Sequence, residues 1–246
     1  MNNYLCSLIF LLTLPGLNAQ EIRKKIEDHS MSWYGYYSDV KTSSRFSVVN
    51  DIQARTIDRI DQWSQLLART GLAFHANEKF TLTVGFADFL SFQKNNTASK
   101  SEYRPWQEIA IKEQYGRITL VSHLRFEQRW FQDIVDDHLI DKYNFNYRLR
   151  YRFDFQYPVY QQKLTLLAGN ETMLNAGSAI TYNYFDQNRT WVGLAYTINE
   201  NFTLQLQAMK IFQQMSNGST LDKINVLRFN LYHTINLKKN GNNSNK

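Results

Sequence analysis

The sequence predicts an all-β protein, a closed antiparallel transmembrane β-barrel of about 10–12 strands. Several segments alternate strictly between apolar and polar residues, and short links alternate with long links between them. Aromatic residues make up 15% of the 246 residues, beside only 10 glycines and 3 prolines. A hydrophobic fraction of 43% and a mean hydropathy of −0.48 exclude a multi-span helical membrane protein, because each helical span needs roughly 20 consecutive apolar residues.

The N-terminus predicts a secretory signal peptide at residues 1–19. Its apolar run, residues 5–14, is too short to span a membrane and is followed by small residues that end at Ala19. A buried first helix is the alternative interpretation. Cys6, the only cysteine, would be removed with the signal peptide, which suits an oxidising compartment. The predicted organisation is therefore a signal peptide at 1–19, a barrel at 20–237 and a polar tail at 238–246.

Period-two alternation is strongest in residues 143–157, where aromatic and leucine side chains share one face and polar side chains the other. This period indicates a β-strand, because at helical spacing the same residues would scatter around the axis. Residues 118–130 repeat the pattern, and weaker copies occur elsewhere. The candidate strands begin near Phe46, Gln65, Phe80, Trp106, Ile118, Tyr143, Lys163, Asn188, Phe202 and Ile224.

This count of about ten is even, as expected for an outer-membrane barrel with both termini on the periplasmic side. Residues 31–39 also look like a strand and would make eleven, which would misplace one terminus. Two interpretations are open: this segment stays at the periplasmic rim, or a further strand within residues 178–185 brings the total to about twelve.

The links between candidate strands are alternately short and long. The short links are residues 77–79, 115–117, 157–161 and 199–201, and the long ones are residues 93–105, 131–142, 172–187 and 213–223. Bacterial outer-membrane barrels have this asymmetry, with short periplasmic turns and longer external loops.

Aromatic residues near the strand ends favour a membrane barrel over a secreted lipocalin-like binding barrel, whose apolar face would point inward. Amphipathic rings settle at the membrane interface. The expected girdle residues are Trp33, Tyr34, Tyr36, Tyr37, Trp63, Trp106, Tyr115, Trp130, Tyr143, Tyr157 and Trp191.

The polar face is rich in arginine, and we expect it to line the lumen. Lipid-facing arginine costs about 2–4 kcal/mol near the membrane midplane. The candidate lumen residues are Arg69, His123, Arg125, Glu127, Arg129, Arg148, Arg150, Arg152, Asp154, Glu171 and Arg189. Seven of them are expected to form one connected charge network: Arg125, Glu127, Arg129, Arg148, Arg150, Arg152 and Glu171.

Within this network, pairing across the link at 131–142 places Glu127 beside Asn146 and diagonally near Arg148. A structural plug of ion pairs is one interpretation. The other is a narrow anion-attracting pore or a pocket for an anionic small molecule, since arginine forks suit phosphate and carboxylate.

The composition argues against other function classes. A phospholipase-like barrel is the enzymatic alternative, but no Gly-x-Ser-x-Gly occurs and the five histidines do not fit its triad. We therefore predict no catalytic residues, no metal site and no cofactor. The basic residues alternate with aromatics along strands rather than forming a patch, so the pI of about 9.2 does not indicate nucleic-acid binding.

Several strings resemble an uncharacterised Bacteroidota-type outer-membrane family, registered as domain of unknown function 2490. They are Trp33, residues 125–129 (RFEQR), 148–152 (RLRYR), Asn170-Glu171 and 185–189 (FDQNR). The resemblance covers residues 33–237 and implies one outer-membrane barrel without an established activity. Expected partners are outer-membrane lipid and, during biogenesis, the insertion machinery, although the last strand ends Thr234-Ile235-Asn236-Leu237 rather than on an aromatic residue.

Overall fold

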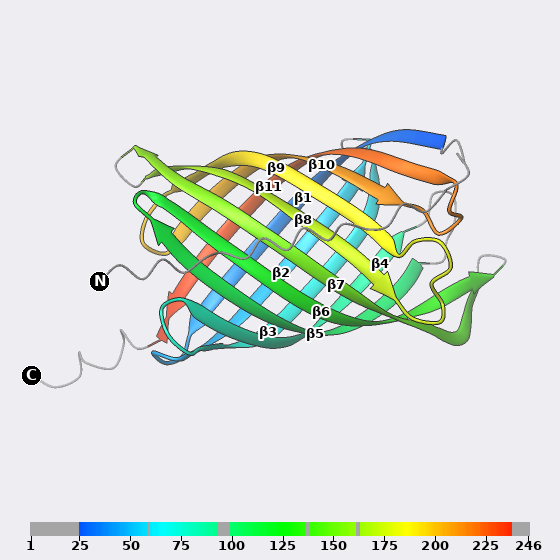
Figure 1. Cartoon of the computed structure of the whole chain (residues 1–246), viewed down its shortest axis with the longest axis horizontal. Coiled ribbons are helices and arrows are strands. Elements are labelled where there is room, and N and C mark those ends of the chain that lie inside the picture. Colours follow the sequence, from blue (N-terminus) through cyan, green and yellow to red (C-terminus); the bar gives the residue numbers. More distant parts are fainter. Residues whose placement is uncertain (1–24, 59, 93–98, 136–137, 161–162, 238–246) are drawn as a thin grey trace, which may run out of the picture.

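The computed structural model describes residues 25–58, 60–92, 99–135, 138–160 and 163–237, and within them eleven strands form one closed barrel (Figure 1). The segment expected to be a signal peptide, residues 1–19 with Cys6, lies outside the described residues. No helix in the described part is long and apolar enough to cross a membrane. The strands are β1 (Lys25–Lys41), β2 (Phe46–Ile57), β3 (Gln62–His75), β4 (Phe80–Phe92), β5 (Ser99–Tyr115), β6 (Ile118–Val135), β7 (His138–Tyr160), β8 (Leu164–Ala176), β9 (Phe185–Thr197), β10 (Phe202–Gln214) and β11 (Thr220–Asn236).

Each strand pairs with the next in antiparallel fashion, and β1 closes the barrel by pairing with β11 in parallel. The barrel is thus confirmed, and its count lies within the expected range, but an even number of strands was wrong. Residues 31–39 lie inside β1 rather than at the rim, and in residues 178–185 only Phe185 belongs to a strand, the start of β9. With an odd number of strands the first and last run in the same direction, so their ladder has to be parallel.

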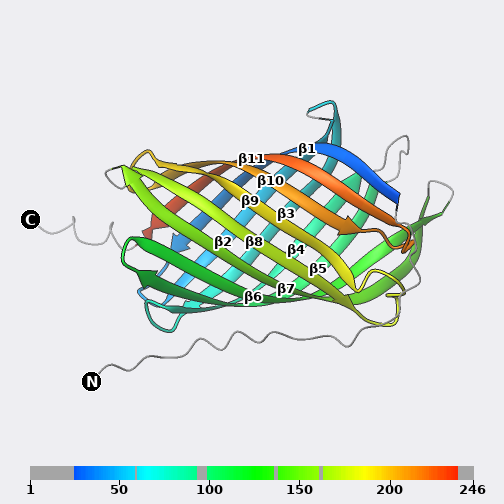
Figure 2. The same ribbon diagram turned by 45° about the horizontal axis from the view of Figure 1, so that its top comes forward.

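The connections divide between two ends of the barrel (Figure 2). At the turn end, where β11 finishes, the links at 42–45, 76–79, 116–117 and 198–201 are short. At the loop end, several segments expected as loops are strand instead. β6 continues to Val135 and β7 begins at His138, while β5 begins at Ser99. These polar residues keep pairing because the ladder uses backbone groups, which every residue in them except Pro105 can supply in full.

The alternating residues of β7 have the orientation of a membrane barrel. Arg148 and Arg150 are 5% and 8% exposed, whereas Leu149 between them and Tyr151 just after them are 41% and 50% exposed. The apolar face therefore points outward and the arginine face inward. A lipocalin-like barrel requires the opposite orientation, so that alternative does not apply.

Three tryptophans expected in the interfacial girdle lie inside the barrel instead. Trp33, Trp106 and Trp191 are 3–4% exposed, whereas Trp63 is 56% exposed. A position near a strand end does not determine whether an indole points inward or outward. Residue parity along the strand determines it. Trp106 lies flat against the wall over Gly71 and Gly85, a pair of facing glycines whose missing side chains make room for it.

The parallel closure predicts a disulfide pattern. Ser30 pairs with Asn225, so a Ser30→Cys/Asn225→Cys variant is expected to form a disulfide on oxidation, because neighbouring strands lie about 4.8 Å apart. The control is Ser30→Cys/Phe229→Cys, which places the cysteines four residues, roughly 13 Å, out of register. The readout is gel mobility with and without reductant, in a Cys6→Ser background. Cross-linking in the control but not in the first variant would contradict the parallel register.

Candidate functional site: a charged lumen

The lumen contains a cavity of about 960 Å³. Its lining extends from His29 and Asp222 near the loop end to Gln156 and Tyr232 nearer the turn end. Its basic residues are Arg55, Arg69, Lys100, Arg104, Arg125, Arg129, Arg148, Arg150, Arg152, Arg189 and Arg228, and its acidic residues are Glu102, Asp154, Glu171, Asp186 and Asp222. Cations therefore outnumber carboxylates on the surface that a solute would meet.

Glu127 of β6 is the most deeply buried of the predicted site residues, at 2% exposure. Its Oε1 lies 3.0 Å from Arg150 Nε and its Oε2 accepts a hydrogen bond from Arg150 Nη2. Oε2 also lies 3.8 Å from Arg104 Nη1. One carboxylate thus serves two guanidiniums from the strands on either side of β6.

Two more glutamates extend this arrangement. Glu102 accepts hydrogen bonds from Arg104 at 2.6 Å and from Arg129 at 2.5 Å. Glu171 lies 3.6 Å from Arg150 and 3.3 Å from Arg189. The result is an alternating chain in which each glutamate joins two arginines, in the order Arg129, Glu102, Arg104, Glu127, Arg150, Glu171 and Arg189.

Within the described ranges, Arg148 is joined to the alternating chain only through the side-chain amide of Asn175. Its Nη2 lies 2.9 Å from Asp186 Oδ2, and its Nε donates to Asn175 Oδ1 at 3.2 Å. Arg129 donates to the same oxygen at 3.5 Å.

A second group, the histidine cluster, lies nearer the turn end. It comprises Glu108, His123, Arg125, Arg152 and Asp154. Arg125 Nε donates to Glu108 at 2.7 Å, and Arg152 Nε lies 2.9 Å from Asp154. Arg152 Nη2 donates to His123 Nε2 at 2.8 Å, so Nδ1 carries the proton that faces Glu108 Oε1 at 3.2 Å.

The structure therefore brings the predicted residues into the lumen, but not as one network. Among the described residues, direct contacts join Arg125 and Arg152 to the histidine cluster, and the other five of the seven to the alternating chain or to Asn175 beside it. Arg69 pairs with Asp51, 2.6 Å away. The lumen is thus divided into separately compensated groups.

The predicted register between β6 and β7 was wrong by two residues. Glu127 faces Arg148, not Asn146, and its ion pair is with Arg150 on the diagonal. At the hairpin tip, Val135 does pair with His138, which is the register the prediction extended down the strands. An irregularity between Gln132 and Ile134 then shifts the ladder by two residues.

Several functional residues escaped the sequence analysis. Glu102 and Arg104 fall in the segment expected as a loop at 93–105, and Asp186 in the one at 172–187. Glu108 and Arg228 lie on the inward face of expected strands, two residues from inward-facing Trp106 and Val226, so parity could have found them. Asp51 and Arg55 belong to β2, where the alternation is weak.

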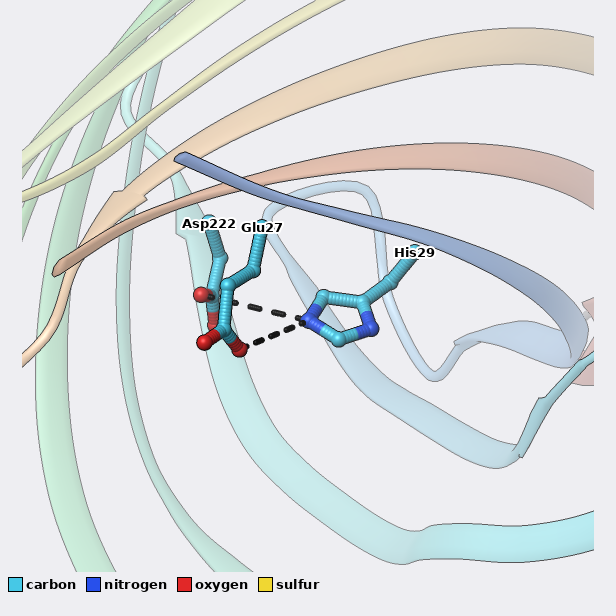
Figure 3. Close-up of side chains that lie close together, drawn as sticks. All are labelled: Glu27, His29 and Asp222. Atoms are coloured by element: carbon cyan, nitrogen blue, oxygen red, sulfur yellow. Dashed lines mark ion pairs between the residues drawn. The ribbon is translucent and has the colours of Figure 1, made fainter. Parts of the chain in front are cut away.

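A rim cluster at the loop end joins β1 to β11 (Figure 3). Ligand atoms of Glu27, His29 and Asp222 lie within 4.8 Å of one another, an arrangement that could hold a divalent cation. The sequence did not predict it, because Asp222 is distant in the chain. The outer face at this level carries the Asp28–Lys223 ion pair, so the rim stands outside the apolar band. There, burial raises the pKa of Asp222, and the hydrogen bond and charge of Lys25 lower that of Glu27.

A Ser–His–Thr chain near the turn end bears on the hydrolase alternative. Ser47 Oγ lies 3.0 Å from His75 Nε2, and His75 Nδ1 lies 3.0 Å from Thr81 Oγ1. Ser47 is 0% exposed and lies on the inner face of β2. A nucleophile needs contact with its substrate, and here neither lipid nor the cavity reaches the hydroxyl.

Comparisons with known proteins identify a family and find two solved structures that are similar in part. Residues 31–222 match the family described as protein of unknown function (DUF2490). A NanC porin structure aligns at a TM-score of 0.43 and 11% identity, over 75% of this chain and 89% of the porin. The siderophore receptor PirA from Pseudomonas aeruginosa aligns at 0.32 and 10%, over 70% of this chain and 33% of the receptor. No curated protein matches the sequence.

Proposed function

Since the chain belongs to the DUF2490 family, for which no activity is known, we propose from its own lumen that it is a non-enzymatic outer-membrane barrel that admits small anions. The observation that carries this proposal is the excess of basic over acidic side chains around the 960 Å³ cavity. A positive, low-dielectric passage raises the local concentration of anions and repels cations.

The size of the cavity favours a binding or transport role over a solid plug. Ligand pockets commonly measure about 300–1,000 Å³, and this cavity lies in that range at about 960 Å³. The glutamates hold the guanidiniums against the wall, as in the alternating chain, so the arginines line the space rather than fill it. In this proposal the outward apolar face contacts outer-membrane lipid. The outer-membrane insertion machinery places the barrel in the membrane during biogenesis.

Planar-bilayer recording tests the proposal. Across a KCl gradient, the purified protein is expected to conduct with a reversal potential displaced toward the chloride equilibrium potential. Arg129→Gln removes one lining charge while Arg104 still pairs with Glu102, so the displacement should shrink.

The control for this experiment is Arg45→Gln, because Arg45 is exposed in the β1–β2 turn, outside the cavity lining. It should leave the reversal potential unchanged. Cation selectivity, or the absence of any conductance from correctly folded protein, would overturn the proposal.

A further inference from the structure

The compensation of charge in the lumen is uneven. Arg69 and Asp51 balance each other, as do Arg148 and Asp186. The histidine cluster has two guanidiniums and two carboxylates around a neutral imidazole. The alternating chain has four arginines and three glutamates, so it carries one excess positive charge, and Arg189 is one of its two ends.

Two further guanidiniums have no carboxylate partner within the part of the chain that the structure describes. Among the described residues, neither Arg55 nor Arg228 has a carboxylate oxygen within the 4.0 Å of an ion pair. Arg55 donates instead to Gln65 at 2.7 Å and to Gln53 at 3.0 Å, and Arg228 donates to the Tyr37 hydroxyl at 3.1 Å. The Nε atoms of both arginines are buried and lack a hydrogen-bond partner among the described residues.

All three of these cations surround one indole, that of Trp33. Trp33 is the ladder partner of Arg55 on one side and of Arg228 on the other. The Cζ atoms of Arg55, Arg189 and Arg228 lie 4.0, 5.1 and 5.8 Å from the Trp33 ring centroid. The negative face of an aromatic ring attracts a cation, but it does not neutralise three of them. Two guanidiniums without a carboxylate partner within the described residues, those of Arg55 and Arg228, therefore meet one end of the alternating chain at this indole.

Apolar side chains adjoin this charge on the cavity wall. Met209, Ile211 and Ile224 pack with Trp33 in one buried cluster, with Met31 against it. All of them line the same cavity as the three arginines. A solute at this place meets guanidinium donors and an apolar surface together.

We infer that Arg55, Arg228 and Trp33, with Arg189 at their side, form a binding subsite for an organic anion that bears a carboxylate or phosphate group. The anionic group lies against the guanidiniums, whose planar forks match its oxygens. The carbon portion packs on Met31, Met209 and Ile211. This subsite deepens the proposed function, on which it rests, by naming the class of solute held inside the barrel.

The experiment is an isothermal titration calorimetry measurement in which phenyl phosphate is titrated into the detergent-solubilised full chain. The wild type is expected to bind it saturably, and Arg55→Gln/Arg228→Gln to bind at least tenfold more weakly. These substitutions strand no carboxylate, and heat-modifiable gel mobility checks that the variant is folded. Arg45→Gln, the exposed-arginine control, should bind as the wild type does.

A second variant remains informative if the first does not fold. Arg228→Lys keeps the charge but loses the fork, so its affinity should lie between those of the wild type and the double variant. Absence of saturable binding to the wild type, or equal affinity of the wild type and either folded variant, would overturn the subsite.

The two proposals fail in different ways. Reversal potentials from the same preparations report the anion preference of the whole lumen. Arginine-dependent binding without anion selectivity would leave the subsite and refute the proposed function. Anion selectivity without binding would refute the subsite and leave the proposed function standing.

Discussion

Replacing Glu127 by Gln is expected to lower the free energy of unfolding by about 3–5 kcal/mol, the usual cost of breaking a buried ion pair from one side. Gln keeps the shape of the side chain and removes only its charge. Arg150 would retain a 3.6 Å contact with Glu171, and Arg104 its contact with Glu102, but two guanidiniums would lose the carboxylate between them. Unfolding of the protein by guanidinium chloride, after it has been refolded into lipid vesicles, measures this loss of unfolding free energy.

Glu78→Gln provides the matched control for Glu127→Gln. Glu78 is exposed in the β3–β4 turn, so its change should stay within about 0.5 kcal/mol. A cost below 1 kcal/mol for Glu127→Gln would mean that the alternating chain does not depend on its central carboxylate.

Removal of the Trp106 side chain is expected to cost about 3–5 kcal/mol, because the indole is buried and its loss leaves a cavity. The Trp106 indole also explains why position 71 holds a glycine. A Cβ at Gly71 would lie 2.8 Å from Trp106 Cζ2 and 3.1 Å from Thr83 Cγ2, so Gly71→Ala alone should cost about 1–3 kcal/mol. In the Trp106→Ala background most of that cost should vanish.

The readout for this pair is a double-mutant cycle of unfolding free energies. A coupling of at least 1 kcal/mol between the two positions is expected, since they touch directly. Trp63→Ala, which removes an exposed indole from the outer face, is the control and should not couple to Gly71→Ala. Additive costs at Gly71 and Trp106 would show that the close approach has no energetic consequence.

Parity along single strands was the part of this structure that the sequence could predict. In β7, Arg148, Arg150 and Arg152 share a face because side chains alternate between the two faces of a strand. Their inward direction follows from the cost of arginine in lipid. The same reasoning would have placed Trp106 inside, since it shares parity with Glu108. The expectation of an aromatic girdle at the strand ends was given precedence over parity, and it placed Trp33, Trp106 and Trp191 on the wrong face.

Relations between strands were harder to predict, because they depend on register. One irregularity beside Gln132 exchanged the expected neighbour of Glu127, and with it the pairing of the whole arginine face. The expected loops concealed Glu102 and Arg104, without which the alternating chain could not be drawn. The subsite around Trp33 depends on β1 pairing with β2 and, in parallel, with β11, and an even number of strands does not allow that parallel pairing.

The parallel seam between β1 and β11 also places the start of β1 and the end of β11 at opposite ends of the barrel. Lys25 stands beside Thr220 at the loop end, whereas Asn236 stands beside Lys41 at the turn end. A reporter fused just before Lys25 and one fused after Asn236 would therefore report on opposite sides of the membrane. Circular permutation by a short linker is also ruled out, since the linker would have to cover the length of a 17-residue strand, about 55 Å.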